Sequence, residues 1–385
     1  MTSGVGQTAS AVSVVAAPVP QRRIGVGILG VSGYGGLELV RLLGAHPHAR
    51  IVAAASRQYA GQPLGSASGA LGDAGLVLDD DPLDPSLWVE RGVEVVFAAL
   101  PHGALAGRAR RFLDAGLRII DLSADFRLRD AAEYARRYDL VHPDPDLLSH
   151  AVYGLPEWGG DAVQGAALVA NPGCYATAVL LAALPAVAAG LWNGAPLVVN
   201  ALSGVSGAGR APSLATHFVE CGQGASPYKV GEDHAHLGEI QQSLRRVLGG
   251  ASSVASRVPN EAGELPLAFN PHLVPMSRGI VANVAIPLAI ATTAESVQTL
   301  YRERYAAAPC VRVLDGLALP ETRHVRGSNR CDIAVRVVAG ARLLLVFAAI
   351  DNLGKGAAGQ AIQNWNRMQG WAEATGLPLE GWSIG

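Results

Sequence analysis

The apolar positions of the chain follow two patterns, and the change between them comes near residue 170. In the first half, short unbroken apolar runs alternate with stretches of helical spacing; the runs are 24–29, 51–55, 93–100 and 117–122. Unbroken runs of this length are typical of strands buried on both faces of a parallel sheet. Their alternation with helices through about residue 150 predicts a doubly wound α/β domain.

The first two runs and the segment between them predict a βαβ unit. Apolar residues from Leu37 to Leu43 recur at helical spacing between the runs. The helix is expected to end at His46, because the residue before Pro47 disfavours helical dihedral angles. Residues 30–36 are therefore expected to form the turn between the first strand and its helix.

The second half of the chain has longer runs, and some of them alternate. These runs are 197–201, 268–274, 280–288, 331–338 and 343–350. In the fourth run Ile333 and Val335 share one face, whereas Asp332 and Arg336 share the other, which is typical of a half-exposed strand. The pattern predicts an α+β domain with a mostly antiparallel sheet, and a last helix over 355–368 that returns to the first domain.

The two patterns together predict the domain organisation. Residues 23–172 and 351–385 are expected to form a Rossmann-type α/β domain, and 173–350 an inserted α+β domain. Residues 1–22 lack acidic residues and are rich in Ala, Ser, Val and Pro, so a disordered tail is expected. A secretory signal is not supported, because the positive charges of Arg22 and Arg23 follow the apolar stretch instead of preceding it.

Composition narrows the class of protein. Half of the 385 residues are hydrophobic, 16% are charged, and the formal net charge is −2. This favours a core-rich enzyme with neither a nucleic-acid partner nor a membrane span, since phosphate binding needs a basic surface. The four cysteines form no CxxC pair, which argues against zinc and iron–sulfur sites, and their scarcity fits a reducing, cytoplasmic compartment.

A glycine-rich turn follows the first predicted strand. A literal GxGxxG motif starts at Gly25 and Gly27, but it would place the phosphate-binding turn inside the strand. The spacing Gly30-x-x-Gly33-x-x-Gly36 falls between strand and helix, where glycines permit a tight turn and close approach to a pyrophosphate. We therefore predict a dinucleotide site at this turn, with an ordinary glycine-rich turn as the alternative.

The end of the second predicted strand indicates which nucleotide binds. NAD sites place an acidic residue there to hold the ribose 2′-hydroxyl group. This chain has Ser56 and Arg57, which suit a 2′-phosphate and favour NADP(H); a plain surface arginine is the alternative. The cofactor residues predicted from these two segments are Gly30, Ser32, Gly33, Tyr34, Gly35, Gly36, Ser56 and Arg57.

Cys174 stands at the start of an apolar helix, directly after Asn171-Pro172-Gly173. Unpaired N–H groups and the helix dipole at such a position favour a thiolate, which is a nucleophile, and the same groups can hold an oxyanion. The alternative is a buried structural thiol. A thiolate beside a nicotinamide nucleotide suggests that an activated acyl group becomes a thioester, which NADPH reduces to an aldehyde.

Many ordered segments resemble one known family. They include GVSGYGGLELVRLL (30–43), DLSADFRL (121–128), NPGCYATA (171–178), SGVSGAGR (203–210), YKVGEDHAHLGEI (228–240) and DNLGKGAAGQAIQNWN (351–366). Over about residues 23 to 368 the chain resembles the N-acetyl-γ-glutamyl-phosphate reductases, relatives of aspartate-semialdehyde dehydrogenase. The resemblance implies an NADP-binding Rossmann domain, an inserted catalytic and dimerisation domain, and a homodimer or homotetramer.

The resemblance also implies roles for the catalytic residues. Cys174 is the nucleophile, and His234 is the acid/base in the family's His-x-His segment, with Glu239 as a supporting carboxylate; the sequence does not separate His234 from His236. Gly238 precedes Glu239 where the family has proline. A metal is not expected, because no cysteine or acidic motif of ligand spacing accompanies the two histidines.

Further residues are assigned by the same resemblance. Arg127 corresponds to the residue that relatives use on the substrate phosphate, and its alternative is a surface ion pair with Asp125 or Asp130. The substrate set is Arg127, Arg210 and His236. Ser206, Gly207 and Asn352 are expected on the nicotinamide side of the cofactor.

The implied reaction is the NADPH-dependent reductive dephosphorylation of N-acetyl-γ-glutamyl phosphate to N-acetylglutamate 5-semialdehyde, with release of inorganic phosphate, in arginine biosynthesis. Two alternatives stay open. One is a carrier-protein-linked aminoadipyl-phosphate reductase of lysine biosynthesis. The other is a non-catalytic NADP-binding regulator, which needs neither Cys174 nor His234 in its motif.

Overall fold

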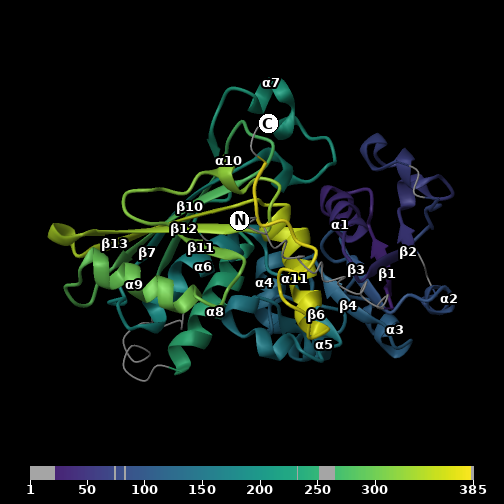
Figure 1. The fold of residues 1–385 in the computed structure, drawn as a ribbon, viewed down its shortest axis with the longest axis horizontal. Helices are drawn as coiled ribbons and strands as arrows, with labels where there is room; N and C mark the ends of the chain where they lie inside the picture. Colours follow the sequence, from purple (N-terminus) through teal and green to yellow (C-terminus); the bar gives the residue numbers. More distant parts are fainter. Residues whose placement is uncertain (1–21, 73–74, 82–83, 232, 251–264, 383–385) are drawn as a thin grey trace, which may run out of the picture.

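The computed structural model describes residues 22–72, 75–81, 84–231, 233–250 and 265–382, and contains two β-sheets, each with its own helices (Figure 1). The predicted tail, residues 1–22, lies outside the described residues except for Arg22. Within the described residues, no helix combines the length and the hydropathy that spanning a bilayer requires.

The first sheet is entirely parallel, as predicted. Its six strands lie in the order β2-β1-β3-β4-β6-β5. They are β1 (Ile24–Leu29), β2 (Ala49–Ala55), β3 (Val95–Ala98), β4 (Arg118–Asp121), β5 (Val152–Tyr153) and β6 (Leu168–Ala170). Every apolar run predicted to be a strand in this half is one, although the third and fourth strands are shorter than their runs.

Helices cover both faces of this sheet, which explains its unbroken apolar runs. Helices α1 (Tyr34–Gly44) and α11 (Gly359–Met368) pack on one face. The other face is covered by α2 (Ser86–Glu90), α3 (Ala109–Asp114) and α5 (Pro145–His150). Helix α4 (Ala131–Tyr138) follows β4 in the chain. The first helix ends two residues before His46, where its end was predicted.

Two glycines inside β1 have a packing role. A Cβ atom at Gly25 would lie 1.8 Å from the carbonyl oxygen of Gly92, and one at Gly27 would lie 2.5 Å from the Trp88 ring. The absence of a side chain at these two positions therefore lets Gly92 and Trp88 pack directly against the backbone of β1. The first two glycines of the literal GxGxxG motif thus lie inside the strand, and the turn between strand and helix begins at Gly30, as predicted; nucleotide binding there stays a prediction.

The second sheet has seven strands in the order β11-β12-β13-β10-β7-β9-β8. Only the β11–β12 and β7–β9 pairs are parallel, so the prediction of a mostly antiparallel sheet is confirmed. The strands are β7 (Leu197–Ser203), β8 (Ser226–Pro227), β9 (Leu267–Leu273), β10 (Ile280–Pro287), β11 (Val311–Val313), β12 (Cys331–Val338) and β13 (Leu343–Ile350).

Three helices, α6 (Cys174–Ala188), α8 (His236–Gly250) and α9 (Ala294–Tyr305), lie against one face of this sheet (Figure 1). On the opposite face, alternate strand positions carry apolar side chains that remain partly exposed. They are Val198, Leu202, Val281, Leu345 and Phe347. The short helices α7 (Phe218–Cys221) and α10 (Thr322–Val325) belong to the loops of this half.

The prediction that β12 is half-exposed is wrong for its first half. Asp332 is fully buried, because Arg312 on the edge strand β11 donates a hydrogen bond of 2.9 Å to it and Arg330 forms an ion pair of 3.0 Å. Burial of a charge is tolerated when it is paired and hydrogen-bonded in this way. Alternation along a strand therefore identified the two faces but not which of them is covered.

The last predicted helix is divided in two. A π-helical turn, η10 (Gly354–Ala358), precedes α11. Ile362 and Trp365 of α11 belong to the same core as Val26 and Phe97 of the first sheet. The chain therefore returns to the parallel sheet after completing the mixed one.

Candidate active site

The Asn171–Gly173 turn connects the parallel sheet to α6, the helix that begins with the cysteine. Strand β6 ends at Ala170, and α6 begins at Cys174, with Gly173 in extended conformation as its N-cap. The Asn171 N–H group donates to the carbonyl oxygen of Asp121, at the end of β4, over 2.8 Å. The cysteine is thus the first residue of a nearly all-buried helix, as predicted.

Glu239, on α8, accepts a hydrogen bond from this turn. Its side chain is fully buried. One carboxylate oxygen, Oε2, accepts hydrogen bonds from the Gly173 N–H group at 2.9 Å and from the Tyr153 hydroxyl at 3.0 Å. The other oxygen, Oε1, accepts from Arg127 Nη1 at 3.0 Å. Three donors on three separate segments therefore fix the carboxylate and, through Gly173, the start of the cysteine helix.

Arg127 completes this arrangement. Its Nε donates to the carbonyl oxygen of Asn171 at 2.8 Å, and its Nη2 donates to that of Leu122 at 2.7 Å. The alternative of a surface ion pair with Asp125 or Asp130 is wrong, because Arg127 is buried and pairs with Glu239. A substrate contact of Arg127 stays a prediction.

Both histidines of the His-x-His segment lie at the same turn. Their ring centroids are 4.8 Å apart, and the Tyr175 ring is 5.4 Å from His234 and 6.0 Å from His236. A Cβ atom added at Gly173 would lie 2.4 Å from His236 Nε2, so that imidazole packs directly on the residue before Cys174. The fold thus brings the thiol of Cys174 together with the imidazoles and the carboxylate of the separate segment 234–239.

Hydrogen bonds assign a tautomer to each imidazole. The His236 N–H group donates to His234 Nδ1 at 3.2 Å, so the proton of neutral His234 lies on Nε2. Arg127 Nη1 lies 3.5 Å from His236 Nε2, which as an acceptor leaves the proton of His236 on Nδ1. That buried Nδ1 has no partner among the described residues. His234 therefore presents a donor at Nε2.

The electrostatics of the site favour neutral groups. Burial, with Lys229 among the neighbouring positive charges, lowers the pKa of both histidines to about 3. Burial also raises the pKa of the Cys174 thiol to about 11, although Arg127 and backbone amides act in the opposite direction. Desolvation thus opposes the effect of the helix start on the thiol, and the predicted thiolate stays a prediction.

The π-helical turn η10 forms another wall beside the cysteine. A Cβ atom at Gly356 would lie 2.7 Å from Cys174 Cβ. Lys355 is fully buried in the same turn, where it donates to Glu157 and to Gln363 at 2.7 Å each. Sequence reasoning noted the segment but missed this contact. The glycine pair around a lone lysine was the signal that could have indicated it.

The predicted nucleotide turn has the geometry that the motif requires. Gly30 has a positive φ of 76°, and a Cβ atom at Gly36 would lie 2.4 Å from the Gly30 carbonyl oxygen. Helix α1 begins at Tyr34 with no side-chain cap, so its first N–H groups are open to a ligand. The Ser56 hydroxyl donates to Ser32 Oγ at 2.9 Å. The residues of this turn fit a dinucleotide pyrophosphate.

Arg57 lies at the rim of this turn, at the end of β2. Its side chain is 75% exposed, and it pairs with Asp81 at 3.0 Å. Asp81 also accepts from Arg108 at 2.5 Å. The guanidinium is thus tethered at one side while most of its surface remains available.

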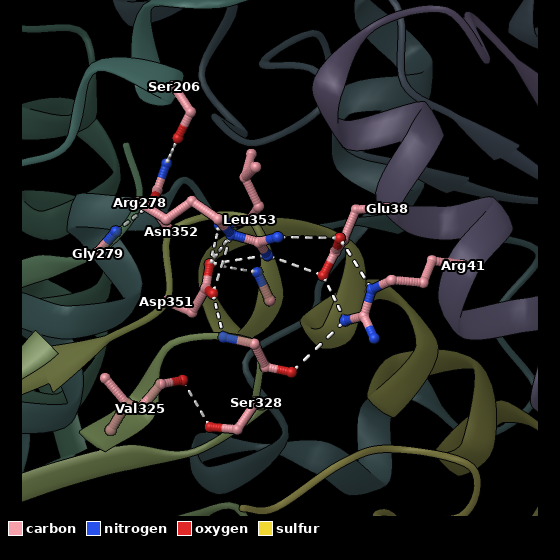
Figure 2. Close-up of polar contacts among 12 residues, drawn as sticks. Glu38, Arg41, Ser206, Arg278, Gly279, Val325, Ser328, Asp351, Asn352 and Leu353 are labelled. Atoms are coloured by element: carbon pink, nitrogen blue, oxygen red, sulfur yellow. Dashed lines mark hydrogen bonds and ion pairs between the residues drawn. The ribbon is translucent and has the colours of Figure 1, made fainter. Parts of the chain in front are cut away.

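The loop after β7 reaches the nucleotide turn. Arg210 Nη1 donates to the carbonyl oxygens of Ser32 at 2.8 Å and Ala67 at 2.9 Å. Asn352 donates to Ser206 Oγ at 3.0 Å (Figure 2), and a Cβ atom at Gly207 would lie 3.8 Å from its Nδ2. The three residues expected beside the nicotinamide are therefore together. Arg210 lies on the nucleotide turn, and its substrate contact stays a prediction.

Comparisons with known proteins agree with this arrangement. Residues 25–166 match the family model "Semialdehyde dehydrogenase, NAD binding domain", and residues 174–352 match "Semialdehyde dehydrogenase, dimerisation domain". Among solved structures, aspartate semialdehyde dehydrogenase II from Vibrio cholerae aligns with a TM-score of 0.66 at 17% identity, covering 90% of this chain and 98% of that one. The NADP complex of the Candida albicans enzyme aligns with a TM-score of 0.64 at 18% identity, covering 92% and 99%. These likenesses establish the fold.

Curated relatives are more similar. The chain is 47% identical over 356 residues to the N-acetyl-gamma-glutamyl-phosphate reductase of Thermus thermophilus, covering 92% of this chain and 99% of that protein. It is 45% identical over 354 residues to the protein of the same name from Symbiobacterium thermophilum, covering 92% and 97%. The chain belongs to the semialdehyde dehydrogenase family and, within it, to the N-acetyl-γ-glutamyl-phosphate reductases.

Proposed function

We propose that this protein catalyses the NADPH-dependent reductive dephosphorylation of N-acetyl-γ-glutamyl phosphate to N-acetylglutamate 5-semialdehyde, with release of inorganic phosphate. The observation that carries the proposal is the turn at Gly173, where the cysteine helix start, two imidazoles and a buried carboxylate meet. The names of the close relatives supply the substrate.

Cys174 acts as the nucleophile in this proposal. Its sulfur attacks the acyl carbon, the bond to the phosphate oxygen breaks, and the thiol proton passes to an imidazole as the thioester forms. The N–H groups at the start of α6 face the developing oxyanion. Residues 30–36 would hold NADPH, which would supply hydride to the thioester carbon; the carbon–sulfur bond of Cys174 then breaks and the aldehyde leaves. The imidazole then returns its proton to the sulfur.

His234 is proposed as the acid/base, and His236 as a substrate-side residue. Support comes from the charge beside each ring: Arg127 Nη1 lies 3.5 Å from His236 Nε2 and opposes uptake of a proton there, whereas the partner of His234 Nδ1 is the neutral backbone N–H group of His236. Glu239 acts through position, because it holds the Gly173 N–H group and Arg127. The proposal that Arg127 and Arg210 act on the substrate rests on the family resemblance. For Arg127 it is also supported by the position of its positive charge, which is hydrogen-bonded to the Asn171 carbonyl oxygen in the turn before Cys174.

NADP(H) is proposed over NAD(H). Support comes from the exposed guanidinium of Arg57 beside Ser56, and a structural neighbour was solved with NADP. The 2′-phosphate would replace part of the Arg57 contact with Asp81. The finer division into residues 23–172 with 351–385, and 173–350, is likewise proposed, as is a cytoplasmic location.

A homodimer or homotetramer is proposed as the working form. The dimerisation family model covers residues 174–352. The mixed sheet also leaves one face with partly exposed apolar side chains, which a second copy would cover.

The reverse reaction tests the proposed function. The purified protein is supplied with NADP, inorganic phosphate and N-acetylglutamate 5-semialdehyde, and NADPH is followed by its absorbance. Sustained turnover that requires phosphate is expected. Turnover independent of phosphate would contradict the acyl-phosphate reaction. Preference for a carrier-linked aminoadipyl semialdehyde would select the lysine-pathway alternative, and absence of turnover with bound NADP would select the regulator.

A further inference from the structure

The guanidinium of Arg278 joins two segments that are far apart in the sequence (Figure 2). It donates to Glu38 on α1 from Nη2 at 2.8 Å and from Nη1 at 3.2 Å. On its other side Nε forms an ion pair of 3.0 Å with Asp351, at the end of β13. Glu38 is 6% exposed and Asp351 is fully buried. The bridge is therefore largely desolvated, where charge pairs act strongly.

Asp351 connects this bridge to the cysteine. Its Oδ1 accepts from the N–H groups of Leu353 at 2.8 Å and Gly354 at 3.1 Å, which start the π-helical turn η10. Its Oδ2 accepts from the Gly327 N–H group at 2.6 Å. Gly356 of that turn packs on Cys174, so the orientation of Asp351 determines where this wall lies.

The backbone beside Arg278 holds the neighbouring asparagine. The Gly279 N–H group donates to Asn352 Oδ1 at 2.7 Å, and Asn352 Nδ2 donates to Ser206 Oγ at 3.0 Å (Figure 2). Residues 278–279 thus fix both members of the Asp351–Asn352 pair. On the opposite side they reach Glu38, two residues beyond Gly36 of the nucleotide turn.

We propose that Arg278 is a positioning residue for hydride transfer, and this inference rests on the proposed function. A dinucleotide held by its pyrophosphate at the start of α1 must present its nicotinamide to the acyl group on Cys174. The distance between these two points depends on how α1 sits relative to η10, and the Glu38–Arg278–Asp351 bridge fixes that relation. Hydride transfer is sensitive to such placement, since a displacement of about 1 Å can cost roughly 100-fold in rate.

A burst experiment without phosphate isolates the hydride step. The Cys174 thiol adds to the aldehyde carbon of N-acetylglutamate 5-semialdehyde. The aldehyde hydrogen then leaves with its bonding electrons to NADP⁺, the hydroxyl proton goes to the imidazole, and a thioester remains. Without phosphate the reaction stops there, so one NADPH forms per active site. The rate of this burst is measured with aldehyde carrying hydrogen or deuterium at the reacting carbon.

Three variants are compared with the wild-type enzyme. Glu38→Gln weakens the α1 end of the bridge with little change of shape, and Arg278→Lys keeps one charge but removes the two-sided fork. Arg41→Met is the matched control. Arg41 donates to the same Glu38 at 2.6 Å within α1, and among the described residues its one hydrogen bond to a distant segment is a 3.5 Å contact with the Gly327 carbonyl oxygen.

We expect the burst of E38Q and R278K to be roughly 10- to 100-fold slower, with a deuterium effect at least as large as that of the wild type. The burst amplitude and the NADP dissociation constant of both variants should stay within about threefold of the wild-type values. The burst rate, burst amplitude and NADP dissociation constant of R41M should stay within the same range. Wild-type burst rates in both E38Q and R278K would overturn the role of Arg278. A slower burst that is fully explained by weaker NADP binding would overturn it as well. A wild-type enzyme that forms no NADPH would instead contradict the proposed function itself.

Discussion

The turn that carries Cys174 and the turn that carries Arg57 are built in opposite ways. Behind Cys174, the charges of Arg127 and Glu239 are buried, and each has several hydrogen bonds within the protein. At Arg57 the charge is 75% exposed and has one carboxylate partner, which it shares with Arg108. The turn before Cys174 is therefore preorganised, whereas the rim at Arg57 is adaptable.

This difference sets what each region can do. A preorganised site holds its groups in place during the reaction and avoids reorganisation as charge develops. An exposed rim contributes modest, screened binding energy, which suits selection between two similar nucleotides. Substitutions behind Cys174 should accordingly affect rate and stability strongly, whereas substitutions at the rim should affect mainly nucleotide preference.

Replacement of Cys174 by serine should have the largest effect. Turnover should fall by at least about 1,000-fold, because the nucleophile is lost, while NADP affinity changes by less than about threefold. The phosphate-dependent assay and a binding titration measure the two quantities. Residual activity above about a tenth of the wild type would reject Cys174 as nucleophile.

Replacement of Glu239 tests the preorganised turn. Glu239→Leu leaves Arg127 buried without its ion-pair partner, so the free energy of unfolding should fall by about 3–5 kcal/mol. Glu239→Gln keeps an acceptor for the Gly173 N–H group and should lose less. Chemical denaturation measures both. Equal stability of wild type and both variants would contradict the proposed support.

Substitution of the two histidines should affect different kinetic constants. His234→Asn should lower kcat by roughly 100-fold or more, as expected for loss of an acid/base group, whereas His236→Asn should act mainly on KM. The reverse pattern would exchange their roles. Measurements at saturating NADP and a range of aldehyde concentrations distinguish the two results.

The same histidines predict a loss of stability in acid. Their pKa is lowered to about 3 in the folded chain, so between pH 6.5 and 3 the unfolded chain binds more protons. Their contribution is present above pH 6.5 and is lost as pH falls toward 3. The midpoint of denaturant unfolding should decrease over this range, and less so in His236→Gln. An identical slope in variant and wild type would show that His236 titrates normally.

Substitution of Arg57 should have the smallest effect. Arg57→Met should reduce the preference for NADP over NAD by about tenfold, since one exposed charge-assisted contact is lost. Values of kcat/KM with each nucleotide measure it. Arg110→Met is a matched control, because Arg110 is also exposed and paired to an aspartate, Asp144. An unchanged ratio in Arg57→Met would make Arg57 a plain surface residue.

The bounds of strands and helices could be predicted from the sequence wherever neighbouring residues determine them. The bounds of β1, β12 and β13 match the apolar runs, and the start of α6 at Cys174 follows from proline and glycine before it. Such signals are local because strand and helix periodicity are set by neighbours in the sequence.

Other features depend on partners that are distant in sequence. The burial of Asp332 requires arginines from two segments, and the pairing of Arg127 with Glu239 requires α8 to lie behind the cysteine turn. The rise in the Cys174 pKa likewise comes from burial, which no helix-start motif reveals. Sequence therefore singled out side chains that the fold brings to one turn, but not the network that holds them.

The position of α11 has a consequence for how the chain is made. Its Ile362 and Trp365 complete the core formed by β1 and β3, although they are separated from those strands by the entire mixed sheet. A ribosome releases the chain from its amino end, so the parallel sheet remains without this helix until residues beyond 368 emerge. The strands of the mixed sheet are thus synthesised before α11, and the parallel sheet gains this helix only after them.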